Sequence, residues 1–135
     1  MRSGIRQRIR RLAVTGVALA AVGGIGFATA GSASAATGKN GTVEVGELGL
    51  YYTANYGFPV FDLYGADSNF SGDVFPGTSI SANDNTESFW NRDTYTWWVF
   101  TNAGAGGSKG YLSPGYGNLS STFKNTISSA YWYEP

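Results

Sequence analysis

The chain has 135 residues with no cysteine and no histidine, and it carries nine basic and nine acidic residues. The lack of cysteine and histidine excludes disulfides, thiol nucleophiles and histidine-ligated zinc. The charge is uneven: five arginines lie before residue 12, so residues 36–135 keep four basic and nine acidic residues, and four minus nine gives −5. That negative charge argues against nucleic-acid binding, which depends on basic residues that contact phosphates.

Residues 1–35 have the three parts of a signal peptide. A basic stretch, Arg2 to Arg11, precedes an apolar segment of 19 residues and an A-x-A pattern at Ala33 to Ala35. A transmembrane anchor is the alternative, but glycine and alanine dominate the segment and favour insertion only weakly. We therefore expect a secreted, extracellular chain that leaves the membrane after cleavage. Arg10-Arg11 leaves both Sec and twin-arginine export open.

Residues 36–42 read as a flexible lead-in, and residues 43–135 as one all-β domain. Short β-prone runs alternate with turn signals, and no segment keeps a helical period over more than two turns. The expected strands are 43–45, 48–52, 59–65, 80–82, 95–101 and 128–134. Residues 95–101 give the strongest strand prediction, because Trp97 to Phe100 are apolar on both faces, as in a sandwich interior.

Two sequence phrases occur twice in the same order. Residues 51–58 align with residues 100–107, and each copy leads to an aromatic and an aliphatic residue. The phrase at 84–88 then aligns with residues 124–128. Two phrases repeated in the same order indicate duplicated β units, about 43–91 and 92–135.

The repeated pattern resembles the Greek-key motif of the βγ-crystallins. It comprises an aromatic, four residues, an aromatic, one residue and glycine, followed later by [ND]-[ND]-x-x-[ST]-S. Tyr51 and Tyr56 fill both aromatic positions of the first copy, where Phe58 replaces the glycine. The second copy keeps Phe100 and has alanine at its second aromatic position. The resemblance spans about residues 43–133 and implies a βγ-crystallin-like sandwich of two Greek-key motifs.

The same resemblance implies calcium half-sites that are completed by the partner motif. Ca²⁺ is bound by carboxylate, amide, hydroxyl and carbonyl oxygens, and these loops supply such groups. Lys124 occupies an Asx position of the second copy, where its charge repels a cation. The alternative is that these residues form only Asx and Ser/Thr turns. The predicted ligands are Asp84, Asn85 and Ser88 in the first half-site, and Asn125, Ser128 and Ser129 in the second, weaker one.

A second acidic loop and the scattered carboxylates are further candidate sites. Residues 67–73 open like an EF-hand loop, but Thr78 stands at the twelfth position in place of glutamate, so we expect a solvated loop. Nothing in the sequence brings two carboxylates together as an acid–base pair, so we expect no enzyme. The carboxylates considered are Asp62, Asp73, Asp84, Glu87 and Asp93.

Aromatic residues make up 16% of the chain. Most are expected to fill the core, because this domain has few aliphatic residues, whereas exposed ones would suit a glycan-stacking platform or a protein interface. The residues considered for such a platform are Trp90, Trp97, Trp98, Tyr131, Trp132 and Tyr133.

The function expected from the resemblance is inhibition of an extracellular peptidase. The superfamily includes small secreted bacterial metalloproteinase inhibitors. This chain is similar to them in its signal peptide, its size and phrases such as "NRDTYTW". The loops expected to enter a peptidase cleft are 66–79 and 102–110. Two alternatives stay open: a calcium-stabilised structural domain, and a module that binds cell-wall glycan or acts as a killer-toxin-like antagonist. We expect a monomer.

Overall fold

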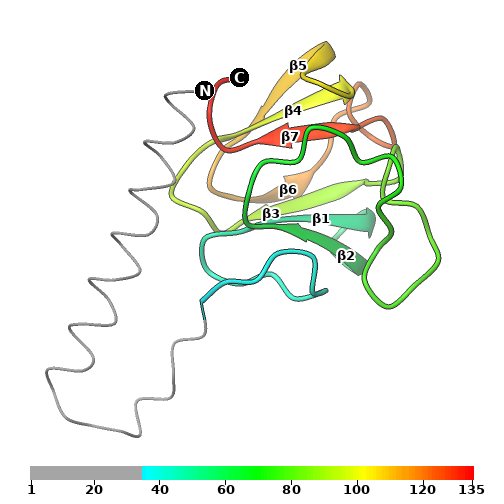
Figure 1. Ribbon diagram of the computed structural model, residues 1–135, viewed down its shortest axis with the longest axis vertical. Coiled ribbons are helices and arrows are strands. Elements are labelled where there is room, and N and C mark those ends of the chain that lie inside the picture. Colours follow the sequence, from blue (N-terminus) through cyan, green and yellow to red (C-terminus); the bar gives the residue numbers. More distant parts are fainter. Residues whose placement is uncertain (1–34) are drawn as a thin grey trace, which may run out of the picture. The chain divides into compact units, whose positions relative to one another are not determined.

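Two antiparallel sheets form the protein in the computed structural model, which describes residues 35–135 (Figure 1). One sheet has the strand order β2-β1-β3-β6 and the other the order β5-β4-β7. The strands are β1 (Leu48–Thr53), β2 (Gly57–Leu63), β3 (Ser88–Asn91), β4 (Trp97–Asn102), β5 (Gly106–Leu112), β6 (Gly115–Asn118) and β7 (Ser129–Tyr131). The described residues contain no helix, so the predicted all-β class is confirmed.

The predicted signal peptide falls almost entirely outside the described residues. Only Ala35 of the segment 1–35 is described. Between residues 35 and 135 no helix is long and apolar enough to cross a membrane.

Each half of the chain lends a segment to the other half's sheet. β6 belongs to the second half but pairs with β3 of the first, with Trp90 opposite Tyr116. In return, Asp67 of the first half forms a bridge with Ala130 of β7, with two hydrogen bonds of 2.9 Å. Figure 1 shows the green connection between β2 and β3 running past β7. This exchange ties the two halves into one sandwich, as expected for paired Greek keys.

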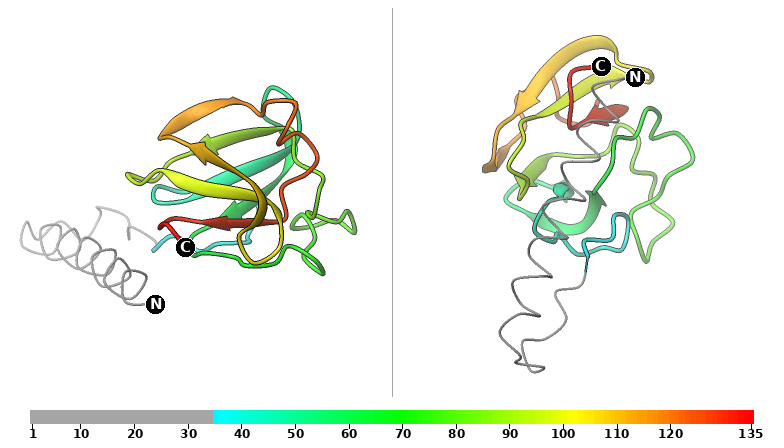
Figure 2. Two further views of the ribbon diagram at one scale, coloured as in Figure 1. Left: turned by 90° about the horizontal axis from the view of Figure 1, so that it is seen from above. Right: turned by 60° about the vertical axis from the view of Figure 1, so that its left-hand side comes forward.

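The sandwich core lies between the two sheets, which Figure 2 shows from two further directions. Alternate residues of β1 and β4, including Leu48, Leu50, Trp97 and Val99, are fully buried. Phe100 is also buried but packs against Tyr131, with ring centroids 5.8 Å apart, outside this core cluster. The prediction of an apolar strand at 95–101 is therefore correct. One face of this strand packs into the sandwich core, and Phe100 on the other face packs against Tyr131.

The two hairpins have the same bulged geometry. Thr53 pairs with Gly57 and Asn102 pairs with Gly106, each after a register shift. Gly107 has φ of +72°, which glycine adopts without strain, whereas Phe58 at the matching position avoids positive φ. One position pair keeps a positive φ in both hairpins, with Tyr56 at +62° and Ala105 at +60°. The duplicated phrase therefore gives duplicated hairpins despite the missing glycine.

Two predicted loop segments are ordered differently from expectation. Residues 102–110 do not form a long turn, because β5 begins at Gly106 and pairs with β4. Residues 36–42 belong to the folded unit Ala36–Pro135 and are not a free lead-in. The Asp62 carboxylate accepts hydrogen bonds from the backbone N–H groups of Asn40 and Gly41, at 3.0 and 2.7 Å. Buried carboxylates require such donors, and the lead-in supplies them.

Glu47 is a fully buried carboxyl group just before β1. Its Oε2 accepts a hydrogen bond of 2.6 Å from the backbone N–H of Glu44, while Oε1 has no hydrogen-bond partner. The pKa of Glu47 is raised to about 7, mainly by burial. The backbone hydrogen bond from Glu44 and the charge of Arg92 oppose the rise, while the charges of Asp62 and Glu44 add to it. The folded protein therefore keeps this carboxyl group protonated in mildly acidic solution.

Replacing Glu47 with glutamine is expected to remove a pH dependence of stability. The folded state binds the proton more tightly than the unfolded chain, so the stabilisation is present below the ordinary pKa of 4.5 and is lost as pH rises to about 7. Urea unfolding between pH 5 and 8 should show Glu47→Gln more stable than the wild type at pH 8, by about 1–2 kcal/mol. Glu134→Gln, an exposed control, should keep the wild-type slope; equal slopes for Glu47→Gln would contradict the assignment.

Candidate cation site

Two serine hydroxyl groups hold the hairpins against the strands beside them. Ser88 Oγ donates to Thr53 O at 2.7 Å and accepts from the backbone N–H of Tyr56 at 3.0 Å. Ser129 Oγ donates to Asn102 O at 2.7 Å and accepts from the N–H of Ala105 at 3.3 Å. Both serines are fully buried. Their hydroxyl groups therefore have structural partners already, although the sequence placed both among the candidate ligands.

The strand registers shift the equivalence of the two Asx phrases by one residue. Ser88 lies opposite Tyr51 and Ser129 lies opposite Phe100, so these two serines are equivalent. Asp84 then corresponds to Asn125, and both have φ of +57°. Their backbone N–H groups make matching bonds across the two halves, to Ile127 O at 3.1 Å and to Thr86 O at 2.8 Å. The sequence alignment, which set residue 84 against residue 124, was wrong by one position.

Oxygen atoms from both halves converge at Asp84. Ser128 Oγ donates to Asp84 Oδ1 at 2.7 Å and lies 3.0 Å from Thr101 O. Asn85, by contrast, turns its amide to Ser81 O at 2.8 Å. Of the residues predicted for the first half-site, only Asp84 lies at this convergence, and the partner motif contributes Ser128 as the resemblance implied. We call Asp84, Ser128 and Thr101 O the cation site.

The matching position in the other half is occupied by protein groups. Glu87 Oε2 accepts from Asn125 Nδ2 at 3.0 Å and lies 3.9 Å from Lys124 Nζ, and Glu87 Oε1 accepts from the N–H of Ala54 at 3.1 Å. The hydrogen bond from Asn125 is the main cause that lowers the pKa of Glu87. The Lys124 ammonium group and the Asn125 amide thus take the place of a metal ion at this carboxylate. The sequence indicated Glu87 only as one of several scattered carboxylates, because the alignment that set residue 84 against residue 124 placed Glu87 opposite Ile127.

The cation site fits a hard divalent ion better than its counterpart does. It offers a carboxylate, a hydroxyl group and a backbone carbonyl, which are the ligand types that Ca²⁺ prefers. Within residues 35–135 no group of three or more acidic, histidine or cysteine side chains is placed to hold a metal. One carboxylate therefore supplies the charge, and water would have to complete the six to eight ligands of Ca²⁺. Such a site suits weak binding.

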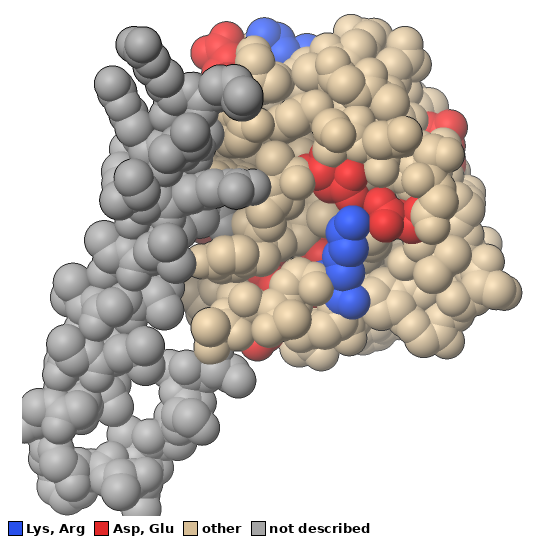
Figure 3. Space-filling view, viewed as in Figure 1, with Lys and Arg blue, Asp and Glu red and all other residues tan. Residues whose placement is uncertain are grey.

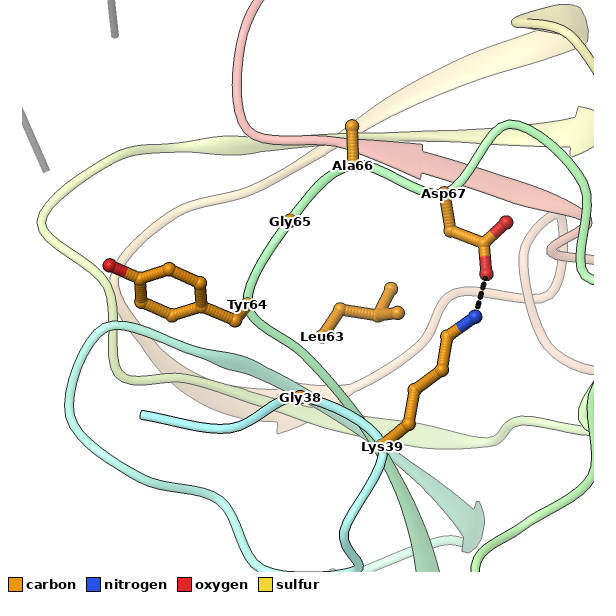
Figure 4. Close-up of a pocket in the computed structure, with 7 residues that line it drawn as sticks. All are labelled: Gly38, Lys39, Leu63, Tyr64, Gly65, Ala66 and Asp67. Carbon is orange, nitrogen blue, oxygen red and sulfur yellow. Dashed lines mark ion pairs between the residues drawn. The ribbon is translucent and has the colours of Figure 1, made fainter. Parts of the chain in front are cut away.

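The EF-hand-like loop at 67–73 already holds a cationic side chain. Lys39 Nζ lies 2.9 Å from Asp67 Oδ2 and 3.2 Å from Asp73 Oδ1. Figure 4 shows the Lys39–Asp67 ion pair among the residues that line a pocket. The volume of this pocket is about 250 Å³. Figure 3 shows a basic side chain against acidic ones on one face. Burial acts to lower the pKa of Lys39, but the hydrogen bonds to both aspartates outweigh it and raise the pKa. The single ammonium charge thus offsets one of the two carboxylate charges of this loop.

The remaining candidate carboxylates have structural partners of their own. Asp93 Oδ2 accepts from Trp97 Nε1 at 3.0 Å, and Asp93 Oδ1 accepts from the N–H of Thr94 at 2.7 Å. Asp62 binds the segment 36–42, and Asp73 binds Lys39. Each acid is engaged separately in holding the fold.

The six aromatic residues named as an alternative glycan platform do not form one, and several of them fill the core as expected. Trp97 and Trp132 belong to the sandwich core, and Tyr131 is buried. Trp98 and Trp90 are half-buried on two different sheets. Two aromatic residues outside this set, Phe58 and Tyr116, are far more exposed than these tryptophans. Strand membership alone does not reveal this, because exposure depends on what covers each sheet.

Replacing Lys39 with methionine is expected to destabilise the domain by roughly 1 kcal/mol, since the ammonium group is partly solvated. Removing it leaves Asp67 and Asp73 facing each other, and burial already raises the pKa of Asp73. The loss should be larger at pH 7 than at pH 4, because protonation removes the repulsion at low pH. Thermal unfolding at both pH values measures it. Lys109→Met, which removes a lysine that lies over Trp98, is the control and should show no such pH dependence.

Comparison with known proteins places the fold. No family model and no curated protein matches the chain. Solved structures match: a βγ-crystallin from Ciona intestinalis has a TM-score of 0.53 and 22% identity, covering 64% of this chain and 98% of that one. An archaeal βγ-crystallin has a TM-score of 0.51 and 23% identity, with coverage of 65% and 98%. A βγ-crystallin domain from Clostridium beijerinckii has a TM-score of 0.53 and 18% identity, with coverage of 64% and 99%. The chain therefore has the βγ-crystallin fold.

Proposed function

We propose that this protein is a secreted, monomeric and non-enzymatic βγ-crystallin-like domain that binds Ca²⁺ weakly at the cation site. The observation that carries the proposal is the convergence of Asp84, Ser128 and Thr101 O from the two halves of the chain. The predicted signal peptide supports secretion. Because the chain has no cysteine, a bound ion would supply stability that disulfides often give to secreted domains.

Calcium would act by neutralising Asp84 and by joining two loops that precede different strands. Asp84 lies in the connection that leads to β3, Ser128 directly precedes β7, and Thr101 belongs to β4. An ion held by all three links the motifs only in the folded state, so its binding favours the folded protein. The residues of this chain bind and orient the ion, and no reaction step follows.

The absence of a catalytic role is supported by the partners of the acidic residues. Asp62, Asp73 and Asp93 hold the lead-in, Lys39 and Trp97 respectively. General acid–base catalysis needs a carboxylate that is free to exchange a proton with a substrate. These carboxylates are engaged in structural contacts.

Calcium is expected to raise the melting temperature, and Asp84→Asn and Ser128→Ala are each expected to abolish the rise. At ten times the dissociation constant the gain is about 1.4 kcal/mol, or roughly 5 °C for a domain of this size. Differential scanning fluorimetry with 10 mM calcium or with chelator measures the shift. This calcium concentration is about ten times the dissociation constant of the weakest extracellular sites, which is roughly 1 mM.

Asn85→Ala is the matched control for the calcium experiment. The Asn85 amide contacts Ser81 O, so its loss should leave the calcium-dependent rise intact while lowering the baseline. If calcium does not stabilise the wild type, or if Asn85→Ala abolishes the rise while Asp84→Asn keeps it, the cation site defined here is wrong.

Peptidase inhibition is a second proposal, which one observation favours. The segment 66–79 is anchored by Phe70 and Phe75, both fully buried, and the N–H of Asp73 bonds Phe70 O at 3.0 Å. Val74 lies between the anchors with 45% of its surface exposed. A loop restrained in this way loses little entropy when it binds, which inhibitor loops require. The hairpin at 102–110 offers no comparable protruding segment.

Titration into a thermolysin-type and a subtilisin-type peptidase tests this second proposal. Inhibition at micromolar protein should weaken about tenfold or more in Val74→Ser, because Val74 is the exposed large apolar side chain of this segment and could fill a specificity pocket. Val45→Ser, which alters a residue that is 73% exposed outside this segment, should inhibit like the wild type. Absence of inhibition of both peptidases by the wild type would refute the proposal.

A further inference from the structure

We propose that an aromatic groove on the outer face of the β2-β1-β3-β6 sheet binds a polysaccharide chain. The groove is separate from the cation site and has a volume of about 440 Å³. It is lined by Tyr51, Tyr56, Phe58, Trp90 and Tyr116.

The groove is built across all four strands of this sheet. Trp90 of β3 lies directly opposite Tyr116 of β6, and their ring centroids are 6.4 Å apart. Tyr51 contacts Tyr56 and Phe58 edge-on, each at 5.9 Å, and Tyr56 contacts Tyr116 at 5.1 Å. These edge-on contacts fix the rings relative to one another. The lining is therefore preorganised, which lowers the ordering cost of binding.

A small apolar cluster supports the groove from behind. Tyr51 packs with Val43 and Val60, and Trp90 packs against the same cluster, apart from the sandwich core. Val43 lies so close to Gly49 that any side chain there would collide with it. The segment before β1 thus closes one end of the sheet face and leaves the aromatic end open.

The groove leaves large aromatic surfaces in water. Phe58 is 73% exposed, Tyr116 is 68% exposed and Tyr56 is 37% exposed. The sandwich interior of the same domain buries its aromatic residues almost completely, as Phe61 and Phe70 show. Adjacent exposed rings on a rigid sheet are typical of an interaction surface.

The chemistry of the lining favours a sugar polymer as the ligand. All five residues are aromatic, three carry a phenol hydroxyl group, and none is acidic or aliphatic. The flat C–H faces of pyranose rings pack on aromatic faces, and sugar hydroxyl groups bond to phenol oxygens, which matches a mostly apolar site with a few polar groups.

The charge beside the groove agrees with this ligand class. Arg92 lies 4.7 Å from the Trp90 ring, and its Nη1 donates to Val43 O at 2.8 Å. Arg92 also acts to lower the pKa of Tyr51 against the larger effect of burial, so its charge is felt in the groove. A guanidinium group at this position favours neutral or uronate-bearing sugars over basic ligands.

Retention on insoluble polymers tests the proposal. The purified protein is mixed with four insoluble polymers: chitin, cellulose, peptidoglycan and immobilised polygalacturonate. Chitin and cellulose represent neutral sugars, peptidoglycan represents the bacterial cell wall, and polygalacturonate represents uronate-bearing sugars. Retention on at least one polymer is expected, and the affinity for its soluble hexamer or short fragment is then measured by tryptophan fluorescence. Tyr116→Ala and Phe58→Ala should each weaken that affinity about tenfold.

Tyr111→Ala is the matched control for the groove variants. Tyr111 is 59% exposed and contacts Trp98 beside Lys109, but it lies on the β5-β4-β7 sheet. Its loss should leave retention and affinity unchanged, and thermal unfolding should show that all three variants fold. Retention on none of the four polymers overturns the proposal. Equal loss in Tyr111→Ala, or dimerisation that disappears in Tyr116→Ala, would also overturn it.

Discussion

The hydroxyl groups of Ser88 and Ser129 make the hydrogen bonds to the two hairpins on which the rest of the structure depends. Each hydroxyl group bridges a carbonyl and an N–H group of a tight hairpin, and each lies at the start of the strand that follows an Asx phrase. Buried backbone groups in a turn must find partners, and a serine from the neighbouring strand satisfies two at once. This contact sets each hairpin against its sheet and thereby fixes where the loops before β3 and β7 lie.

The same duplicated framework produces two chemically different positions. Asp84 and Asn125 occupy equivalent places with the same backbone conformation, and each faces a residue of the other half. Asp84 Oδ1 accepts from the Ser128 hydroxyl group, which also lies 3.0 Å from Thr101 O, and Asp84 Oδ2 accepts from the Asn83 amide. Asn125 meets Glu87, whose charge is satisfied by an amide and by Lys124. The two loops are equivalent in backbone conformation but differ in their side chains. Asp84 and Ser128 make one a candidate ion site, whereas Asn125 and Lys124 neutralise Glu87 in the other.

Charged groups elsewhere in the domain follow the same logic of internal neutralisation. Lys39 lies between Asp67 and Asp73, while Asp62 is bonded by backbone N–H groups of the segment 36–42. Glu47 is the exception, because burial outweighs the opposing effect of Arg92 and raises the pKa of Glu47 to about 7. This acidic domain without disulfides thus uses most of its carboxylates as hydrogen-bond acceptors within the fold. The aromatic groove, by contrast, stays open to solvent.

The sequence by itself determined the all-β class, the duplicated hairpins and the Greek-key resemblance, because β-propensity, turn residues and repeated phrases are local. It did not determine which Asx residues are equivalent, since strand register is set by long-range pairing: Ser88 with Tyr51 and Ser129 with Phe100. Nor did it reveal that residues 36–42 are bound, or that Phe58 and Tyr116 share a groove. Those features join residues far apart in the chain, so only tertiary packing decided them.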